Sequence, residues 1–185
     1  MSTETASSTH YTSTAKWLHW LMGIVIIFDL LIAGTLEDMP VDEKTQTLIG
    51  HSSIGITLLV LALVRIMWRR RNPAPMLPSN VPVWQATLSR ISHFTLYALM
   101  VVVPLTGIYI AQFSPVPVQP FGAFVLGGDG MTEAGFQSVR DLHAAMTGLL
   151  FILVCLHILA ALYHRLIRKD NVLQRMAPRF RRKKD

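Results

Sequence analysis

The sequence predicts an all-α integral membrane protein, a four-helix bundle with both termini in the cytoplasm. Three observations carry this prediction. The chain of 185 residues is 51% hydrophobic and only 15% charged, with a mean hydropathy of +0.41, whereas soluble domains are nearer 25% charged. Four stretches are apolar over about 20 residues, the length needed to cross a bilayer. The positive residues lie almost entirely on one side of these stretches.

The basic character of the chain does not by itself indicate a nucleic-acid partner. There are 17 Lys and Arg against 11 Asp and Glu, but a nucleic-acid-binding protein carries such charge on a polar surface. Here the charges lie outside long apolar runs. The single cysteine, Cys155, excludes an intramolecular disulfide and a cysteine-based metal site. These counts leave an integral membrane protein as the expected class.

The four apolar stretches define the predicted elements in order. Backbone groups in lipid must be hydrogen-bonded within the chain, which favours helices. We therefore expect one membrane domain over residues 1–185 with a fixed order of segments. These are a mobile tail at 1–14, helices at about 17–36, 49–68, 91–113 and 142–167, a proline-rich link at 72–84, a loop at 114–130 and a basic cytoplasmic tail at 169–185.

The distribution of positive charge orients the predicted bundle. Of the 17 Lys and Arg, only Lys44 and Arg140 fall in the two loops of the far side, residues 37–48 and 114–141, which leaves 15 on the other side. The positive-inside rule then places both termini in the cytoplasm. The basic face could also contact anionic membrane lipid.

Six of the seven histidines lie within or at the ends of the predicted helices, where ionisable residues are costly. One interpretation is that they hydrogen-bond lipid headgroups at the interface, but six are many for that role. On the fourth helix, His143, His157 and His164 are spaced by fourteen and seven residues. These steps return to within about 40° and 20° of the start and the longer one rises about 21 Å. One helix face therefore presents imidazoles near both sides of the bilayer.

Depth pairs these histidines with others. His51 begins the second helix on the outer side, at the depth of His143. His19 lies about one turn into the first helix on the inner side, and on depth alone it has three possible partners: His157, His164 and His93. We prefer His157, because the other two lie closer to the cytoplasmic surface. Two layers of facing imidazoles in a bundle core suit two haems.

Small residues and one carboxylate also lie in the spans. Small side chains would leave room for a flat macrocycle, although they also allow close helix packing. They are Gly23, Gly50, Ser52, Ser53, Gly55, Gly107 and Gly148. Asp29 interrupts the first helix, where a buried carboxylate is expensive. We expect it to be protonated or paired with Ser52, Ser53 or a haem edge, and a role in proton supply is a hypothesis.

On these residues the chain resembles the prokaryotic cytochrome b561 family of four-helix di-haem membrane proteins, which includes superoxide oxidase. The resemblance runs from Lys16 to Pro178. Its segments are residues 16–20 (KWLHW), 50–55 (GHSSIG), Ser92-His93, the three histidines of the fourth helix and 169–171 (KDN) with Leu173, Met176 and Pro178. It implies two b-type haems, one on His51 with His143 and one on His19 with His157. It also implies electron exchange with the quinone pool and a place in the bacterial inner membrane. Asp29 departs from the apolar residue expected there.

Two irons about 21 Å apart would connect the two sides of a lipid core about 30 Å thick. The expected activity is that of a membrane-bound oxidoreductase passing electrons from periplasmic superoxide to ubiquinone. His93 and His164 remain at the cytoplasmic end, to bind ubiquinone or relay its protons, or as interfacial anchors.

Arg140 and Lys44 lie before the outer histidines and are candidates to steer superoxide. We expect the N-termini of the second and fourth helices to add to their attraction for an anion. Arg140 could instead pair with Asp141 or with a haem propionate.

Two other functional classes remain open. A cytochrome b subunit could link a periplasmic dehydrogenase or hydrogenase to the quinone pool, docking its partner on the outer loops. A non-redox protein could use the histidines to bind a metal or to sense pH. No nucleic-acid partner is expected, and the sequence indicates no particular protein partner.

Overall fold

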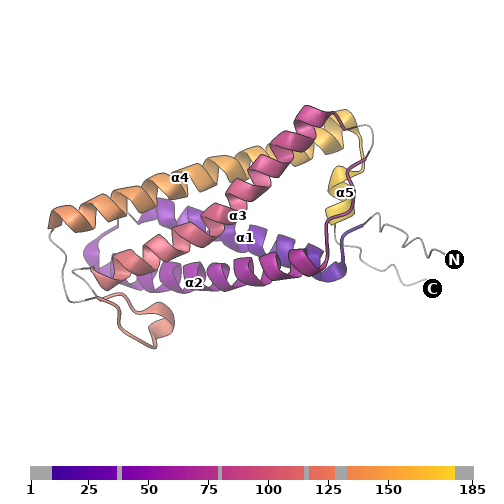
Figure 1. The fold of residues 1–185 in the computed structure, drawn as a ribbon. Coiled ribbons are helices and arrows are strands. Elements are labelled where there is room, and N and C mark those ends of the chain that lie inside the picture. Colours follow the sequence, from indigo (N-terminus) through magenta and orange to yellow (C-terminus); the bar gives the residue numbers. More distant parts are fainter. Residues whose placement is uncertain (1–9, 37–38, 79–80, 115–116, 128–132, 178–185) are drawn as a thin grey trace, which may run out of the picture.

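The computed structural model describes residues 10–36, 39–78, 81–114, 117–127 and 133–177. Four long helices follow one another in these residues: α1 (Ser13–Thr35), α2 (Val41–Arg71), α3 (Val83–Gln112) and α4 (Glu133–Tyr163). Each is long and apolar enough to cross a membrane. The prediction of an all-α membrane protein with four spanning helices is confirmed (Figure 1).

All four helices begin earlier than the sequence predicts, α1 at Ser13 rather than at 17. α2 starts at Val41 rather than at 49, α3 at Val83 rather than at 91, and α4 at Glu133 rather than at 142. Hydropathy marks only the part of a helix that can lie in lipid. Backbone hydrogen bonding continues into polar turns outside it, because each added residue still gains a helical bond.

The predicted tail of residues 1–14 is wrong at its C-terminal end. α1 already begins at Ser13, and the Thr12 hydroxyl caps it by accepting a hydrogen bond from Ala15 N at 3.2 Å. The rest of that prediction, residues 1–9, lies outside the described residues.

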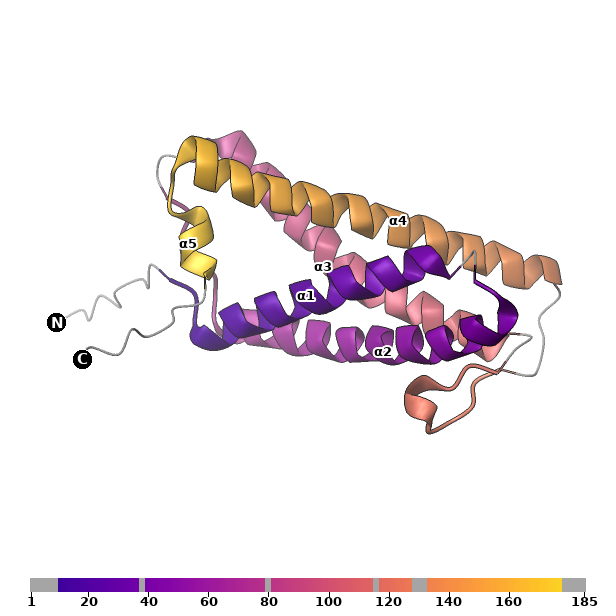
Figure 2. The same cartoon turned by 180° about the vertical axis from the view of Figure 1, so that it is seen from behind.

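The chain after α4 is folded where a tail was predicted. His164–Arg168 form a π-helical turn (η2), Lys169 takes a left-handed φ of 52°, and a short helix α5 (Val172–Met176) follows. The Trp20 indole N–H donates to the Met176 carbonyl at 3.0 Å. α5 therefore lies against the start of α1 (Figure 2), and residues 178–185 of the predicted tail lie outside the described residues.

Part of the predicted loop at 114–130 is also folded. Val118 and Leu126 exchange backbone hydrogen bonds of 2.9 and 2.8 Å around a short 3-10 turn, η1 (Pro120–Gly122). The Phe121 N–H donates to Ser53 Oγ at 2.7 Å. This contact folds the loop back onto α2 at the end of the bundle opposite α5 (Figure 1).

Consecutive helices pack in order, α1 on α2, α2 on α3 and α3 on α4. The buried core is small. One cluster lies around Met22 of α1 and Ala62 of α2, and a second around Leu99 of α3 and Leu150 of α4. Most other side chains of these helices remain partly exposed, as expected where lipid rather than water covers them.

The two ends of the bundle differ in what they gather. The start of α1, the end of α2, the start of α3 and α5 lie at one end, which we call the inner end (Figures 1 and 2). Arg69, Arg70 and Arg71 close α2 there. The end of α1, the start of α2, η1 and the start of α4 lie at the other, outer end (Figure 1).

Candidate functional site

Two histidines from different helices face each other toward the outer end. His51 of α2 and His143 of α4 have ring centroids 6.3 Å apart, with ring planes inclined by 86°. The sequence paired these two residues by depth alone, and the structure brings their side chains together. α2 and α4 are not neighbours in the chain, so this pair joins the two halves of the bundle.

The His143 imidazole is held in one tautomer by α3. The Thr106 hydroxyl donates to the Val103 carbonyl at 2.7 Å and lies 2.9 Å from Nδ1 of His143. A hydroxyl has a single hydrogen, so Nδ1 must carry the ring proton and donate it to Thr106 Oγ1. Nε2 keeps its lone pair, which is the state that a metal ligand needs.

The His51 imidazole is held by a carboxylate of α1. Nδ1 of His51 lies 2.9 Å from Oδ1 of Asp29, and both side chains are mostly buried. The predicted pairing of Asp29 with Ser52 or Ser53 is wrong, because both hydroxyls donate to the Ile49 carbonyl within α2. Hydroxyls in helices commonly bond back to the preceding turn in this way.

Three histidines meet toward the inner end. The His157 ring centroid on α4 lies 6.0 Å from that of His19 on α1 and 5.3 Å from that of His93 on α3. The preferred pair, His19 with His157, is therefore brought together, and His93 lies against His157 as well. In the described part of the chain neither His19 nor His157 makes a hydrogen bond, which leaves their ring nitrogens available to a ligand. His93 differs, because its Nδ1 lies 2.6 Å from the Ser89 carbonyl and must donate to it.

His164, the third possible partner of His19, lies in a separate arrangement. It opens the η2 turn, and its Nδ1 lies 2.6 Å from Oδ2 of Asp170, a carboxylate that is almost fully buried. Oδ1 of the same carboxylate accepts the Val172 N–H that begins α5. The carboxylate thus fixes the His164 ring and the junction between η2 and α5 at once.

The two facing pairs fit a metal held between opposed imidazoles. With metal–nitrogen bonds of about 2.0–2.1 Å, two such rings have centroids about 6 Å apart, close to the 6.3 and 6.0 Å observed. Within the described ranges no group of three or more His, Cys, Asp or Glu is placed to hold a bare metal ion. Pairs of imidazoles suit a haem iron, whose macrocycle supplies the other ligands.

Small residues leave room beside both pairs. Gly23 and Gly55 follow His19 and His51 by four residues, within about 40° on the same helix face. A Cβ atom at either glycine would meet no atom within 4 Å. This open space one turn from each imidazole is compatible with a flat macrocycle.

Gly148 lies on a different face of α4 from His143. It is exposed, and five residues along α4 place it about 140° around the helix from His143. The idea that Gly148 gives a macrocycle room stays a prediction.

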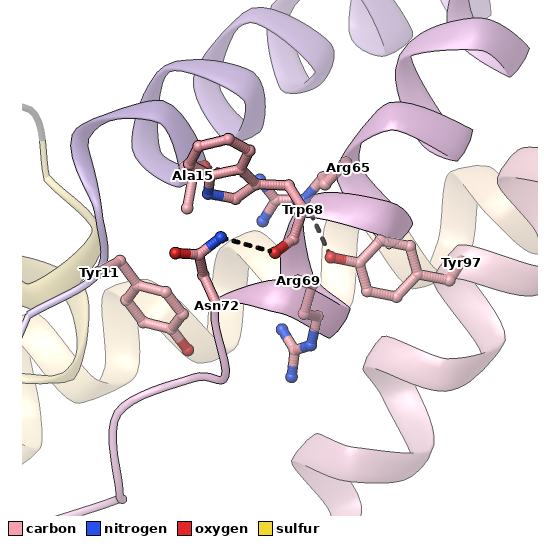
Figure 3. Close-up of a pocket in the computed structure, with 7 residues that line it drawn as sticks. All are labelled: Tyr11, Ala15, Arg65, Trp68, Arg69, Asn72 and Tyr97. Atoms are coloured by element: carbon pink, nitrogen blue, oxygen red, sulfur yellow. Dashed lines mark hydrogen bonds between the residues drawn. The ribbon is translucent and has the colours of Figure 1, made fainter. Parts of the chain in front are cut away.

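Arg65 of α2 ties three helices together at the inner end. Its Nη1 donates to the Ala15 carbonyl at 2.7 Å, and its Nε donates to the Tyr97 hydroxyl of α3 at 3.0 Å. Figure 3 shows these side chains in the small pocket that they line. Ala15 lies about one turn before His19, so this anchor fixes the start of α1 beside the inner imidazoles. From the sequence, Arg65 was only one of the 15 positive residues on one side of the spans.

Lys44 and Arg140 lie in helices, where the sequence predicted loops at 37–48 and 114–141. Lys44 precedes His51 by seven residues on α2, and Arg140, which is exposed, precedes His143 by three on α4. Both helices begin ten residues before their histidines, a rise of about 15 Å. The two helix N-termini therefore lie away from the imidazoles themselves, because their effect fades within the first turn, and their contribution to attracting an anion at the outer end stays a prediction.

Comparison with known proteins gives one family and several relatives. The family described as prokaryotic cytochrome b561 matches residues 10–179. The chain is 26% identical over 171 residues to a protein named probable superoxide oxidase CybB in Yersinia pestis, covering 92% of this chain and 97% of that protein. It is 27% identical over 174 residues to cytochrome b561 homolog 1 of Escherichia coli strain K12, covering 91% and 97%. Cytochrome b561 homolog 2 of the same strain is 33% identical over 129 residues, covering 68% of each chain.

Proposed function

The chain belongs to the prokaryotic cytochrome b561 family of membrane electron-transfer proteins, and from this premise we propose that it carries electrons from periplasmic superoxide to ubiquinone. Two b-type haems would supply the one-electron carriers, held by His51 with His143 and by His19 with His157. The observation that carries the proposal is the presence of two facing imidazole pairs, one toward each end of the same membrane helices. His143 and His157 stand about 21 Å apart along α4.

The overall reaction balances with two superoxide anions for each quinone. Each superoxide loses one electron and leaves as O₂, and the quinone takes two electrons and two protons to become a quinol. The protons would come from the cytoplasmic side through His93 or His164. His93 lies against His157, and the fixed ring of His164 has a nitrogen left over for a quinone oxygen.

The proposed outer partner is a small anion. Lys44 and Arg140 stand just outside the outer imidazole pair, and local positive charge raises the encounter rate of an anion. The Yersinia pestis relative, named as a probable superoxide oxidase, favours superoxide as this anion.

The charge asymmetry along the chain supports the cytoplasmic location of both termini and the bacterial inner membrane as the compartment. Positive residues close α2 at the inner end, where the positive-inside rule places the cytoplasm.

Haem binding is tested by replacing one histidine of each pair. We expect the purified protein to hold two haems per chain and His51→Ala and His19→Ala to hold one each, as measured by extracted haem and by the reduced-minus-oxidised spectrum. His10→Ala is the matched control and should retain two. A wild-type protein without b-type bands would contradict the proposal and leave a non-redox histidine protein.

The substrate is tested with the purified protein, a superoxide source and added ubiquinone. We expect superoxide consumption coupled to quinol formation in a 2:1 ratio. Arg140→Glu should slow the reaction several-fold and reduce its dependence on ionic strength, because steering by this charge is lost. Full haem content without superoxide consumption would instead favour a subunit serving a periplasmic dehydrogenase or hydrogenase.

A further inference from the structure

Asp29 is the residue that neither the family resemblance nor the proposed electron path explains. It lies on α1, whereas the two histidines of the outer pair lie on α2 and α4. Its carboxylate is nevertheless 2.9 Å from Nδ1 of His51. The Asp29 side chain is 12% exposed, so it is not a surface charge. A carboxylate in this position is costly in lipid, and the contact with His51 is what compensates for it.

Binding of a metal by His51 would fix the direction of this hydrogen bond. If Nε2 of His51 binds a metal, the ring proton must be on Nδ1, and Asp29 Oδ1 accepts it. A carboxylate that accepts from a ligating imidazole makes that imidazole a stronger electron donor to the metal. The opposite imidazole, His143, donates to the neutral Thr106 hydroxyl, which has a weaker effect of the same kind because it carries no charge.

The inner pair has the opposite electrostatic surroundings. His19 and His157 make no hydrogen bond among the described residues. The Arg65 guanidinium is fixed on the Ala15 carbonyl, one turn before His19. A negative charge near an iron centre favours its oxidised form and a positive charge favours its reduced form. Both effects are strong here, because charges interact more in a medium of low dielectric constant than in water.

We propose that Asp29 is a positioning residue that orients His51 and sets the reduction potential of the outer site below that of the inner site. The inference rests on the proposed function, because it requires a haem between His51 and His143. It goes beyond that function by assigning to one residue of this chain the order of the two potentials. The positive charges of Lys44 and Arg140 would raise the reduction potential of the outer site, which Asp29 lowers. They act from the aqueous edge, where salt screens them, whereas Asp29 touches the imidazole.

The test is a redox titration of the purified protein at fixed pH, following the visible bands of both haems. Asp29→Asn keeps the shape and a hydrogen-bond acceptor but removes the charge. We expect the lower of the two potentials to rise so that the reduction equilibrium of that site changes at least tenfold, which for one electron corresponds to about 59 mV. The higher potential should stay unchanged. Repeating the titration with and without Asp29→Asn in a His19→Ala background, where only the outer haem is bound, assigns the shift to the outer site.

Asp170→Asn is the matched control. It makes the same chemical change in the second Asp–His pair of the chain, where Asp170 holds His164, a residue outside the two proposed ligand pairs. Both potentials should stay as in the wild type. A shift of the higher potential in Asp170→Asn would show that the inner site also depends on a carboxylate, and the contrast on which the proposal rests would then be overturned.

The remaining outcomes separate this inference from the proposed function. Two haems with unchanged potentials in Asp29→Asn would overturn the inference and leave the proposed function intact, whereas a wild-type protein with fewer than two haems would overturn the function itself. If Asp29→Asn loses the outer haem, its potential cannot be measured, and Asp29→Glu is the variant that tests the proposal. With the charge retained, it should bind both haems with the wild-type order of potentials, and binding both with the lower potential raised would refute the proposal.

Discussion

Gly107 shows how much a single residue controls at the outer site. A Cβ atom at this position would lie 3.2 Å from Cε1 of His143. The imidazole cannot easily move away, because the residue before Gly107, Thr106, holds its Nδ1. A side chain at this position would therefore force the ring or the helices to shift by a few tenths of an ångström.

We predict that Gly107→Ala displaces His143 and weakens haem binding at the outer site. Overpacking of this kind costs about 1–3 kcal/mol, so the haem content should fall from about two toward one per chain, as measured by extracted haem. Gly148→Ala is the control, because a Cβ atom there meets nothing within 4 Å. A Gly107→Ala protein with two haems and an unchanged spectrum would contradict the role given to this residue.

Histidine positions could be predicted from the sequence, but their partners could not. The spacing of His143 and His157 follows from helix geometry, and the depth match with His51 follows from the span limits. The carboxylate of Asp29 and the hydroxyl of Thr106 reach their histidines from other helices. Such contacts depend on how each helix is rotated about its axis, which hydropathy does not determine.

At the scale of helices, Arg65 is a polar connection between three helices at the inner end. It joins α2 to the Ala15 carbonyl of α1 and to the Tyr97 hydroxyl of α3. Apolar packing between membrane helices has no hydrophobic driving force, so polar contacts of this kind help to select one arrangement.

Replacing Arg65 should destabilise the bundle more than replacing one of its partners. Arg65→Met loses two hydrogen bonds from a charged donor, about 1.5–3 kcal/mol each, whereas Tyr97→Phe loses one. We expect the thermal unfolding midpoint in detergent to fall in both variants and at least twice as far in Arg65→Met. Equal midpoints in the two variants would show that the contact with Ala15 contributes nothing.

The helix ends mark the limit of prediction for whole elements. The four spans were predicted because about 20 apolar residues can satisfy a bilayer only as helices. Their extensions were missed, because turns such as the one around Lys44 carry no hydropathy signal. The short α5 was missed for another reason: it is held in place by Trp20, a residue far away in the sequence.

At the scale of the whole molecule, the charge distribution makes a prediction about orientation. Four spans return the chain to its starting side, and the positive-inside rule assigns that side to the cytoplasm. We expect a C-terminal green fluorescent protein fusion to fluoresce and a C-terminal alkaline phosphatase fusion to be inactive. Alkaline phosphatase inserted in segment 128–132 should be active, and the reverse pattern would invert the direction of the proposed electron path.

The sequence by itself determined the class of the protein, its four spans and the two depths at which histidines lie. It could do so because hydropathy and helix periodicity are local properties of the chain. The tertiary structure decided which side chains meet. It placed Asp29 on His51, His93 beside His157, and Arg65 between three helices. These contacts depend on the rotation and approach of separate helices. The polar groups that contact the outer histidines come from α1 and α3, whereas the histidine spacing that could be predicted lies on α4.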